Sequence, residues 1–278
     1  MIPRFERPES VAEAAQLLAG GDWALLAGGT DLYPAHVGRQ IARPVLDLSR
    51  IGGLRGIHES DAGWAIGATT TWTDVMRAGL PPLFDALKAA AREVGGVQIQ
   101  NAGTVAGNVC NASPAADGIA ALLALDADVE LHSVAGVRRV ALAQFLLGAR
   151  RTARRDDELV VGLHIPRRGP RARSVFRKLG GRRYLVISIT MVAVALDVDA
   201  AGHVTNAGVA VGSCSAVARR LAPLERRLLG AHRSRLADGV DAVDLAGLAP
   251  IDDVRASAAY RLDATLTLLR RALADLAT

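Results

Sequence analysis

The chain has 278 residues, half of them hydrophobic, which is enough to bury a full core and argues against disorder. It contains no apolar run of about 18 residues, and its N-terminal segment lacks a basic stretch followed by an apolar one, so the sequence predicts neither a membrane span nor a signal peptide. The formal net charge is +5, and a cytoplasmic location is the default expectation.

The first predicted block covers residues 1–53. Ser10 and Glu13 have the spacing of a capping box, and the apolar positions that follow at helical spacing stop before Gly20. Strand-like runs then occur at residues 24–26 and 44–48. This order predicts a small α/β unit.

The first strand-like run ends in a glycine turn, Leu25-Leu-Ala-Gly-Gly-Thr-Asp-Leu32. Such a turn, followed by a hydroxyl and a carboxylate, is typical of a phosphate contact. Neither G-x-G-x-x-G nor GxxxxGK[ST] occurs in the chain, so the usual dinucleotide fold and the P-loop are not favoured.

The second predicted block covers residues 54–167. Its expected elements are a strand at 63–68, helices at 73–78, 83–94 and 118–125, and a strand at 128–132. Between them, residues 101–117 form a turn-rich run with Gly103 and Gly107 beside short polar side chains. Free N–H groups in such a run can cradle phosphate, whereas the alternative is a well-capped surface loop. Ser113 is expected to cap the helix at 118–125, with Pro114 in its first turn.

The third predicted block covers residues 168–278. Two β-rich runs, 185–198 and 204–211, are joined by a four-residue turn and indicate a hairpin. Helices are expected at 223–229 and 255–276, the second capped by Asp252 or Asp253. The block as a whole predicts helices on one face of an antiparallel sheet.

Several kinds of chemistry are not supported. Cys110 and Cys214 are too few and too far apart for an iron–sulfur or zinc site, and neither HExxH nor G-x-S-x-G nor CxxC occurs. Cys110 is interpreted as a small buried thiol, with a redox role as the alternative. No metal site is therefore predicted in this chain.

The motifs taken together resemble the FAD-binding subunits of the molybdenum hydroxylases, which include xanthine dehydrogenases, carbon monoxide dehydrogenases and 4-hydroxybenzoyl-CoA reductases. The resemblance spans nearly the whole chain in order and spacing. It rests on these segments: Ala27-Gly-Gly-Thr-Asp31, Thr104-Val-Ala-Gly-Asn108, Asn111-Ala-Ser-Pro-Ala-Ala-Asp117, Glu158-Leu-Val160, His164-Ile-Pro166 and Phe176-Arg-Lys-Leu-Gly-Gly-Arg182.

The resemblance implies an α+β fold: a two-subdomain FAD-binding fold of the PCMH/VAO type followed by the C-terminal sheet and helices. FAD would be held non-covalently, although His36 near the first glycine turn leaves a covalent link open. The cofactor residues implied by the resemblance are Leu26, Ala27, Gly28, Gly29, Thr30, Asp31, Leu32, Gly103, Thr104, Gly107 and Asn108 around the pyrophosphate, Asn111, Ser113 and Asp117 at the ribityl, ribose or flavin edge, and Leu159, Val160 and Lys178 beside the ring.

Two of these residues carry alternative interpretations. Lys178 matches the family lysine at the flavin, where a cation would stabilise the anionic reduced ring. Without the resemblance it is interpreted as a surface lysine at a strand end, because lysines are mostly exposed. Asp117 could serve only as an acid that compensates a helix dipole. No catalytic residue independent of the flavin is predicted.

Residues 150–183 carry twelve basic residues against three acids. The chain has ten aromatics for stacking, and these basic residues are scattered around prolines and glycines, so nucleic-acid binding is not favoured. A solvated or partner-facing connector is the main interpretation, and a flavin-directed role for one or two members is the alternative.

By resemblance, the chain is the flavoprotein of a three-component enzyme in which a molybdopterin subunit oxidises the substrate and a small subunit with 2Fe–2S clusters relays electrons to FAD. NAD⁺, oxygen or another acceptor would then receive them. Two alternatives remain: a stand-alone FAD-dependent oxidoreductase of the same fold, and a flavin-free assembly or interaction protein. The sequence names neither the substrate nor the acceptor, and it leaves the stoichiometry open.

Overall fold

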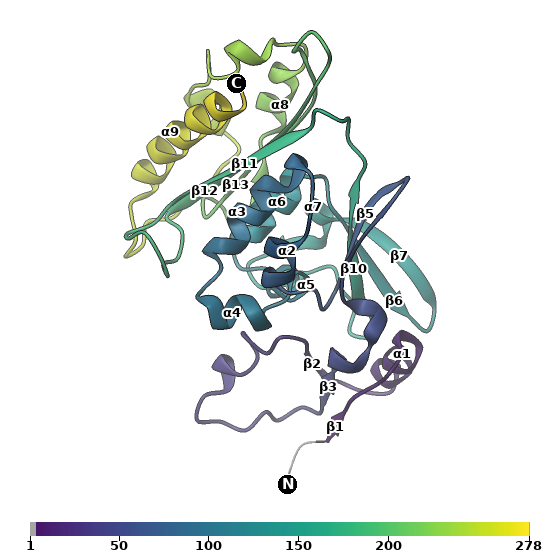
Figure 1. The fold of residues 1–278 in the computed structure, drawn as a ribbon. Helices are drawn as coiled ribbons and strands as arrows, with labels where there is room; N and C mark the ends of the chain where they lie inside the picture. The colour runs from purple at the N-terminus through teal and green to yellow at the C-terminus, as the bar shows by residue number, and fades with distance from the viewer. Residues whose placement is uncertain (1–3, 278) are drawn as a thin grey trace.

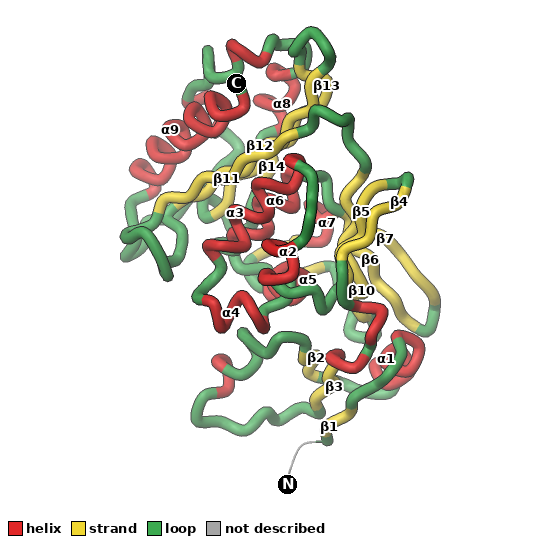
Figure 2. The backbone as a smooth tube through the Cα atoms, viewed as in Figure 1, coloured by secondary structure: helices red, strands yellow, loops and turns green. Residues whose placement is uncertain are grey.

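The structure is a computed structural model that describes residues 4–277. Residues 1–3 of the first predicted block and residue 278 of the third lie outside the described residues. Three main sheets and their helices follow one another along the molecule (Figures 1 and 2). The predicted α+β class is confirmed. None of the helices between residues 4 and 277 has the length and hydropathy needed to cross a bilayer.

The N-terminal unit is a small parallel sheet with one helix. Its elements are β1 (Phe5–Glu6), α1 (Val11–Ala19), β2 (Ala24–Leu26) and β3 (Val45–Asp47), with strand order β1-β3-β2. Ser10 caps α1 by accepting from the Glu13 N–H at 3.1 Å, and Gly20 ends the helix. The capped helix and both strands are therefore confirmed.

The second unit combines an antiparallel sheet, ordered β4-β5-β10-β6-β7, with a layer of short helices. Its strands are β4 (Ile57–Ser60), β5 (Gly63–Gly67), β6 (Asp128–Ser133), β7 (Gly136–Ala141) and β10 (Leu159–Pro166), and β8 (Leu146–Gly148) pairs separately with β9 (Arg151–Thr152). Its helices are α2 (Trp72–Arg77), α3 (Asp85–Glu93), α4 (Val97–Ala102), α5 (Val105–Asn111), α6 (Asp117–Ala124) and α7 (Leu142–Phe145).

The third unit is a four-stranded antiparallel sheet in the order β11-β12-β13-β14. Its elements are β11 (Arg173–Leu179), β12 (Thr190–Val198), β13 (Val204–Gly212), β14 (Arg219–Arg220), α8 (Ala222–Leu228) and α9 (Ala258–Leu276). Along β12, Val192 and Val194 pack in the core with α8 and α9, whereas Ala193 and Ala195 face the core of the second unit. The C-terminal helices thus lie on one face, as predicted, while α6 packs against the other (Figure 1).

Four local predictions were wrong. The turn-rich run at 101–117 contains the end of α4 and all of α5, and α6 begins at Asp117 after Ala116, so Ser113 does not cap it. The predicted strand at 185–198 begins only at Thr190. Ser257 is the N-cap of α9 and accepts from the Tyr260 N–H, and the predicted Asp252 accepts from the Ala258 N–H beside it without being the N-cap residue. At α9 the nearer side chain of Ser257 takes the N-cap position, and at α5 the burial of Val105 and Val109 favours a helix over a loop.

Candidate cofactor site

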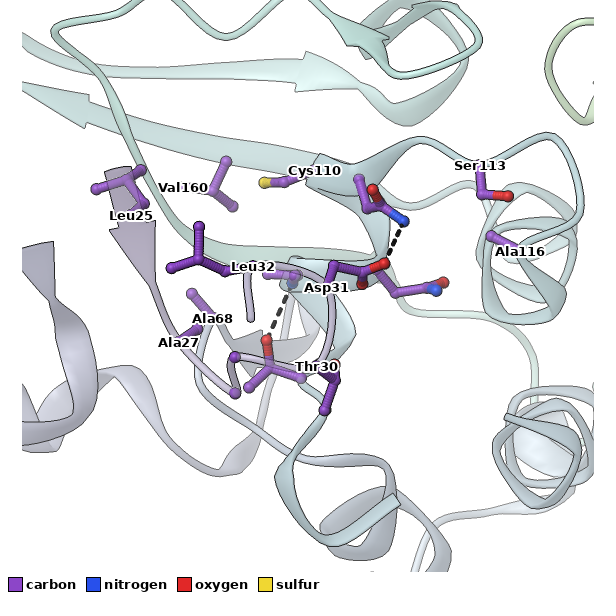
Figure 3. A pocket seen from close by; sticks show the side chains of 18 of the residues that line it. Leu25, Ala27, Thr30, Asp31, Leu32, Ala68, Cys110, Ser113, Ala116 and Val160 are labelled. Atoms are coloured by element: carbon purple, nitrogen blue, oxygen red, sulfur yellow. Dashed lines mark hydrogen bonds between the residues drawn. The ribbon is translucent and has the colours of Figure 1, made fainter. Parts of the chain in front are cut away.

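A cavity of about 690 Å³ lies between the N-terminal unit and the second unit. This size is within the usual range for cofactor pockets. Leu25, Ala68 and Val160 gather at an apolar end, and Asp31 and Ser113 mark a polar side (Figure 3). The cavity therefore suits a ligand that is apolar in one part and strongly polar in another.

The first wall is the glycine turn that follows β2. Leu25 and Ala27 line the cavity, whereas Leu26 points to the opposite face of the strand and packs in a separate buried cluster. The alternation of side chains along a strand explains this division. Leu26 is thus the one residue of the predicted turn that the structure places outside the lining.

Two glycines of this turn act differently. Gly29 has φ +70°, a conformation that side-chain-bearing residues rarely adopt. A Cβ on Gly28 would lie 1.9 Å from the carbonyl oxygen of Ala102, at the end of α4. Gly28 therefore allows the two walls to meet backbone to backbone.

The second wall is the first part of α5. Thr104 caps this helix by accepting from the Gly107 N–H at 3.0 Å, and both residues line the cavity. Asn108 also lines it, and its side-chain oxygen is buried without a hydrogen-bond partner among residues 4–277. Since buried polar atoms are normally paired, this oxygen is available to a donor on a ligand.

The polar side carries a chain of hydrogen bonds from the first wall to the second. The Asn111 amide nitrogen donates to the Asp31 carboxylate at 2.9 Å, one of the bonds drawn in Figure 3. The Arg150 guanidinium in turn donates to the Asn111 side-chain oxygen at 3.0 Å. This chain links the glycine turn, the end of α5 and the β8–β9 hairpin.

The start of β10 closes the apolar end through Leu159 and Val160. The preceding Glu158 is buried and accepts two hydrogen bonds from Arg138, at 2.6 and 2.8 Å. These bonds hold the pKa of the Glu158 carboxyl below its usual range. The ion pair thereby fixes the end of the strand that forms this part of the cavity.

Cys110 lines the cavity beside the apolar end. Burial raises the pKa of its thiol to about 11. The group is therefore a protonated thiol at neutral pH, and a thiol in that state is a poor nucleophile. This agrees with the interpretation of Cys110 as a small residue that fills space.

Asp117 and Lys178 do not line the cavity. Their side chains are buried against each other, with Lys178 Nζ 2.6 Å from the Asp117 carboxylate and 3.9 Å from Glu93. Ser188 donates a further hydrogen bond to Asp117 at 2.6 Å. Burial raises the pKa of the Asp117 carboxyl, against the opposing effects of Lys178 and Ser188. Asp117 directly follows Ala116, which does line the cavity.

The structure brings most of the predicted site residues to one cavity. Those that line it are Ala27, Gly28, Gly29, Thr30, Asp31, Leu32, Gly103, Thr104, Gly107, Asn108, Asn111, Ser113, Leu159 and Val160. Lining residues that were not singled out as cofactor-binding from the sequence include Trp23, Leu25, Arg43, Leu48, Ala68, Trp72, Arg150 and Arg154. The last two belong to the basic segment for which a flavin-directed role of one or two members was the alternative. Strand alternation could have identified Leu25, but the others depend on long-range packing.

Comparisons with known proteins agree with this geometry. Residues 3–168 match the FAD binding domain in molybdopterin dehydrogenase, and residues 175–276 match the CO dehydrogenase flavoprotein C-terminal domain. The chain belongs to the family of FAD-binding subunits of the molybdenum hydroxylases. It is accordingly a flavoprotein subunit of an oxidoreductase, and FAD is its cofactor.

Relatives of this family cover the chain to different extents. The xanthine dehydrogenase FAD-binding subunit of Escherichia coli O157:H7 is 37% identical over 166 residues, which are 58% of this chain and 57% of that protein. The carbon monoxide dehydrogenase medium chain of Hydrogenophaga pseudoflava is 31% identical over 98% of this chain and 96% of its own length. A chain of reconstituted CO dehydrogenase from Oligotropha carboxidovorans superimposes with a TM-score of 0.87 at 29% identity, covering 100% of this chain and 99% of that one.

The cavity's own residues fit FAD. Its apolar end suits a planar ring, and the unpaired Asn108 oxygen suits a hydroxyl donor of the sugar or ribityl chain. The approach of Gly28 to Ala102 leaves backbone rather than side chains beside the space where the predicted pyrophosphate segments meet. Arg150 and Arg154 line the same cavity and supply positive charge that suits an anion.

Proposed function

We propose that this chain is the electron-transfer subunit of a molybdenum hydroxylase complex, holding FAD non-covalently in the cavity between its first two units. The observation that supports this proposal is the meeting of the two predicted glycine segments across one cavity, with Gly28 against Ala102. Bound FAD supplies the redox chemistry that connects one-electron iron–sulfur clusters to an acceptor. The chain's own part is to bind, orient and enclose that cofactor.

The partners in this proposal are a molybdopterin-binding large subunit and a small subunit with 2Fe–2S clusters. The relatives support it because their names describe FAD-binding subunits and medium chains of dehydrogenases. NAD⁺, oxygen or another acceptor is proposed to receive the electrons, and the complex is proposed to be cytoplasmic. The large subunit would select the organic substrate, so this chain alone has no substrate oxidation to perform.

Within the cavity, the proposed roles follow the lining. The glycine turn at 27–32 and the segment Thr104, Gly107 and Asn108 bind the pyrophosphate, with the Asn108 side-chain oxygen left to accept from a hydroxyl group of the cofactor. Asn111 and Ser113 contact the neighbouring hydroxyl groups. Leu159 and Val160 pack against an apolar ring. Asp117 and Lys178 are proposed to act on the flavin edge as a buried pair, since the lysine charge is already bound by the aspartate.

An absorption spectrum of the purified chain tests the proposal, followed by release of any chromophore by heat and its identification. We expect flavin bands, FAD in the supernatant, and no bleaching when candidate substrates are added to the isolated chain. Bleaching by a substrate in the isolated chain would favour a stand-alone oxidoreductase. A colourless protein that takes up no added FAD would contradict the proposal and favour a flavin-free assembly protein.

The electron-transfer step needs the assembled complex. Co-expression with the genes of the partner subunits, followed by anaerobic addition of substrate, should reduce the flavin only when the cluster-bearing subunit is present. Addition of NAD⁺ or oxygen to the reduced complex then identifies the acceptor by reoxidation. Flavin reduction that is independent of the cluster subunit would exclude the proposed route.

A further inference from the structure

Arg150 is held in an unusual backbone conformation at the polar side of the cavity. It has φ +56°, and its N–H donates to the Ala112 carbonyl oxygen at 3.0 Å. Ala112, which ends α5, is itself left-handed with φ +46°. Such conformations are unfavourable for residues with a side chain, and they tend to occur at functional sites. Here the two lie together where α5 ends and the β8–β9 hairpin turns.

The side chain of Arg150 is positioned by an amide whose orientation is chemically determined. Arginine can only donate and an ionised carboxylate can only accept, so Asn111 must direct its oxygen to Arg150 and its nitrogen to Asp31. This arrangement separates Arg150 from the only carboxylate among the cavity-lining residues. Asn111 thus fixes Arg150 relative to Asp31, and the arginine keeps its positive charge unpaired with that carboxylate.

The other two cations of the cavity are already engaged. Arg43 forms an ion pair with Asp22 at 2.9 Å. Arg154 donates to the carbonyl oxygens of Arg155 and Glu158, at 2.8 and 2.9 Å. Arg150, in contrast, has no carboxylate within ion-pair distance among the residues that the structure describes. The hydrogen bond to Asn111 uses one of the five N–H donors of the guanidinium, which leaves the other four for a ligand or for water.

We propose that the Arg150 guanidinium binds the pyrophosphate of FAD, with Asn111 and Asp31 as the residues that position it. This inference rests on the proposed function, because it takes FAD to be the ligand of the cavity. A guanidinium forms paired hydrogen bonds with phosphate oxygens, and its charge balances an anion that backbone N–H groups only solvate. One arginine of the basic segment at 150–183 thereby has a cofactor-directed role.

The experiment compares ligands with and without the diphosphate, using the full-length chain freed of flavin. Binding of FAD, ADP and adenosine is measured for the wild type and for Arg150→Gln, Arg150→Lys and Arg151→Gln. The last is the matched control, because Arg151 is an exposed neighbour that does not line the cavity. Each titration is repeated over a range of salt concentrations.

Arg150→Gln should weaken the binding of FAD and of ADP by about ten- to a hundredfold, as expected for the loss of a charge-assisted hydrogen bond. It should also reduce the salt dependence of their binding and leave adenosine unchanged, while Arg150→Lys recovers part of the loss. Asn111→Ala should weaken FAD binding in the wild type and weaken it less in Arg150→Gln, because part of the effect of the amide acts through the guanidinium.

The possible failures are distinguishable. A wild-type chain that binds no FAD overturns the proposed function and this inference with it. Normal FAD binding in the wild type with equal affinities for Arg150→Gln and Arg151→Gln overturns the inference alone. An equal loss for adenosine and ADP also overturns it, since that result assigns the arginine to the shape of the cavity rather than to the phosphates.

Discussion

The two glycine segments that face each other across the cavity look alike in sequence but are built differently. The first, around Gly28 and Gly29, is an irregular turn with one left-handed residue. The second, around Gly107, is the opening turn of a regular helix capped by Thr104. On one wall glycine therefore allows an unusual backbone conformation and a close approach of two backbone segments. On the other wall it keeps the space beside a helix free of a side chain.

This difference shows why one motif is more demanding than the other. A Cβ on Gly28 would overlap the Ala102 backbone at 1.9 Å, whereas a Cβ on Gly107 would lie 2.7 Å from the Thr104 hydroxyl. The Thr104 hydroxyl can rotate away at the cost of the helix cap, but a carbonyl oxygen at the end of a packed helix cannot move in this way. The first wall should therefore tolerate less change than the second.

The largest effect is expected for Gly28→Ala. The added methyl group must push the glycine turn away from the end of α4, which should cost about 3 kcal/mol or more of stability by overpacking. It should also abolish FAD retention, because both walls shift. Urea unfolding and the flavin content of the purified variant measure these effects. Wild-type flavin content would show that the turn does not need this close approach.

Gly107 has a helical backbone conformation, so a substitution there tests the available space and not the backbone conformation. Gly107→Val should remove bound FAD by placing a branched side chain in the cavity, while far-ultraviolet circular dichroism remains that of the wild type. Gly107→Ala is the matched control: its helix propensity gain of up to about 1 kcal/mol offsets part of the contact with Thr104. Normal flavin content in the valine variant would contradict the assignment of this segment to the pyrophosphate.

A smaller effect is expected at Gly29, where conformation rather than space is decisive. Gly29→Ala should cost about 1–2 kcal/mol, because φ +70° is unfavourable for alanine. The added Cβ also meets the Tyr33 ring at 2.6 Å, but that side chain is exposed and can move. Gly29→Asn makes the same contact and tolerates the left-handed region better, so it should be more stable than the alanine variant in thermal unfolding. Equal stabilities would assign the loss to Tyr33.

The parts of the fold that local chemistry decides were predicted from the sequence. The helix at Val11–Ala19 has a serine cap and a glycine stop, and the β12–β13 hairpin has a short turn between two apolar runs. Helix α5 was missed because Gly107, Asn108 and Asn111 are poor helix formers. Burial of Val105 and Val109 in the core of the second unit stabilises that helix, and this packing is not visible in a local pattern.

The candidate site divides in the same way. Residues within the two motifs were found because their order and spacing match a family, and most of them line the cavity. Arg150 and Trp23 lie outside any motif and reach the cavity through the β8–β9 hairpin and the turn before β2. Lys178 was placed at the flavin by resemblance, but its ion pair with Asp117 forms between residues far apart in the sequence and follows only from the fold.

The smallest effect is expected at Thr104, where a substitution tests the helical wall without adding bulk. Thr104→Ala removes the hydroxyl that accepts from the Gly107 N–H and should cost about 1 kcal/mol, as for other helix caps. Because the first turn of α5 lines the cavity, FAD should bind up to about fivefold more weakly if the full loss is expressed there. Thr104→Ser keeps the acceptor and should restore both stability and affinity. If serine behaves like alanine, the Thr104 methyl group and its packing stabilise this wall, and the cap does not.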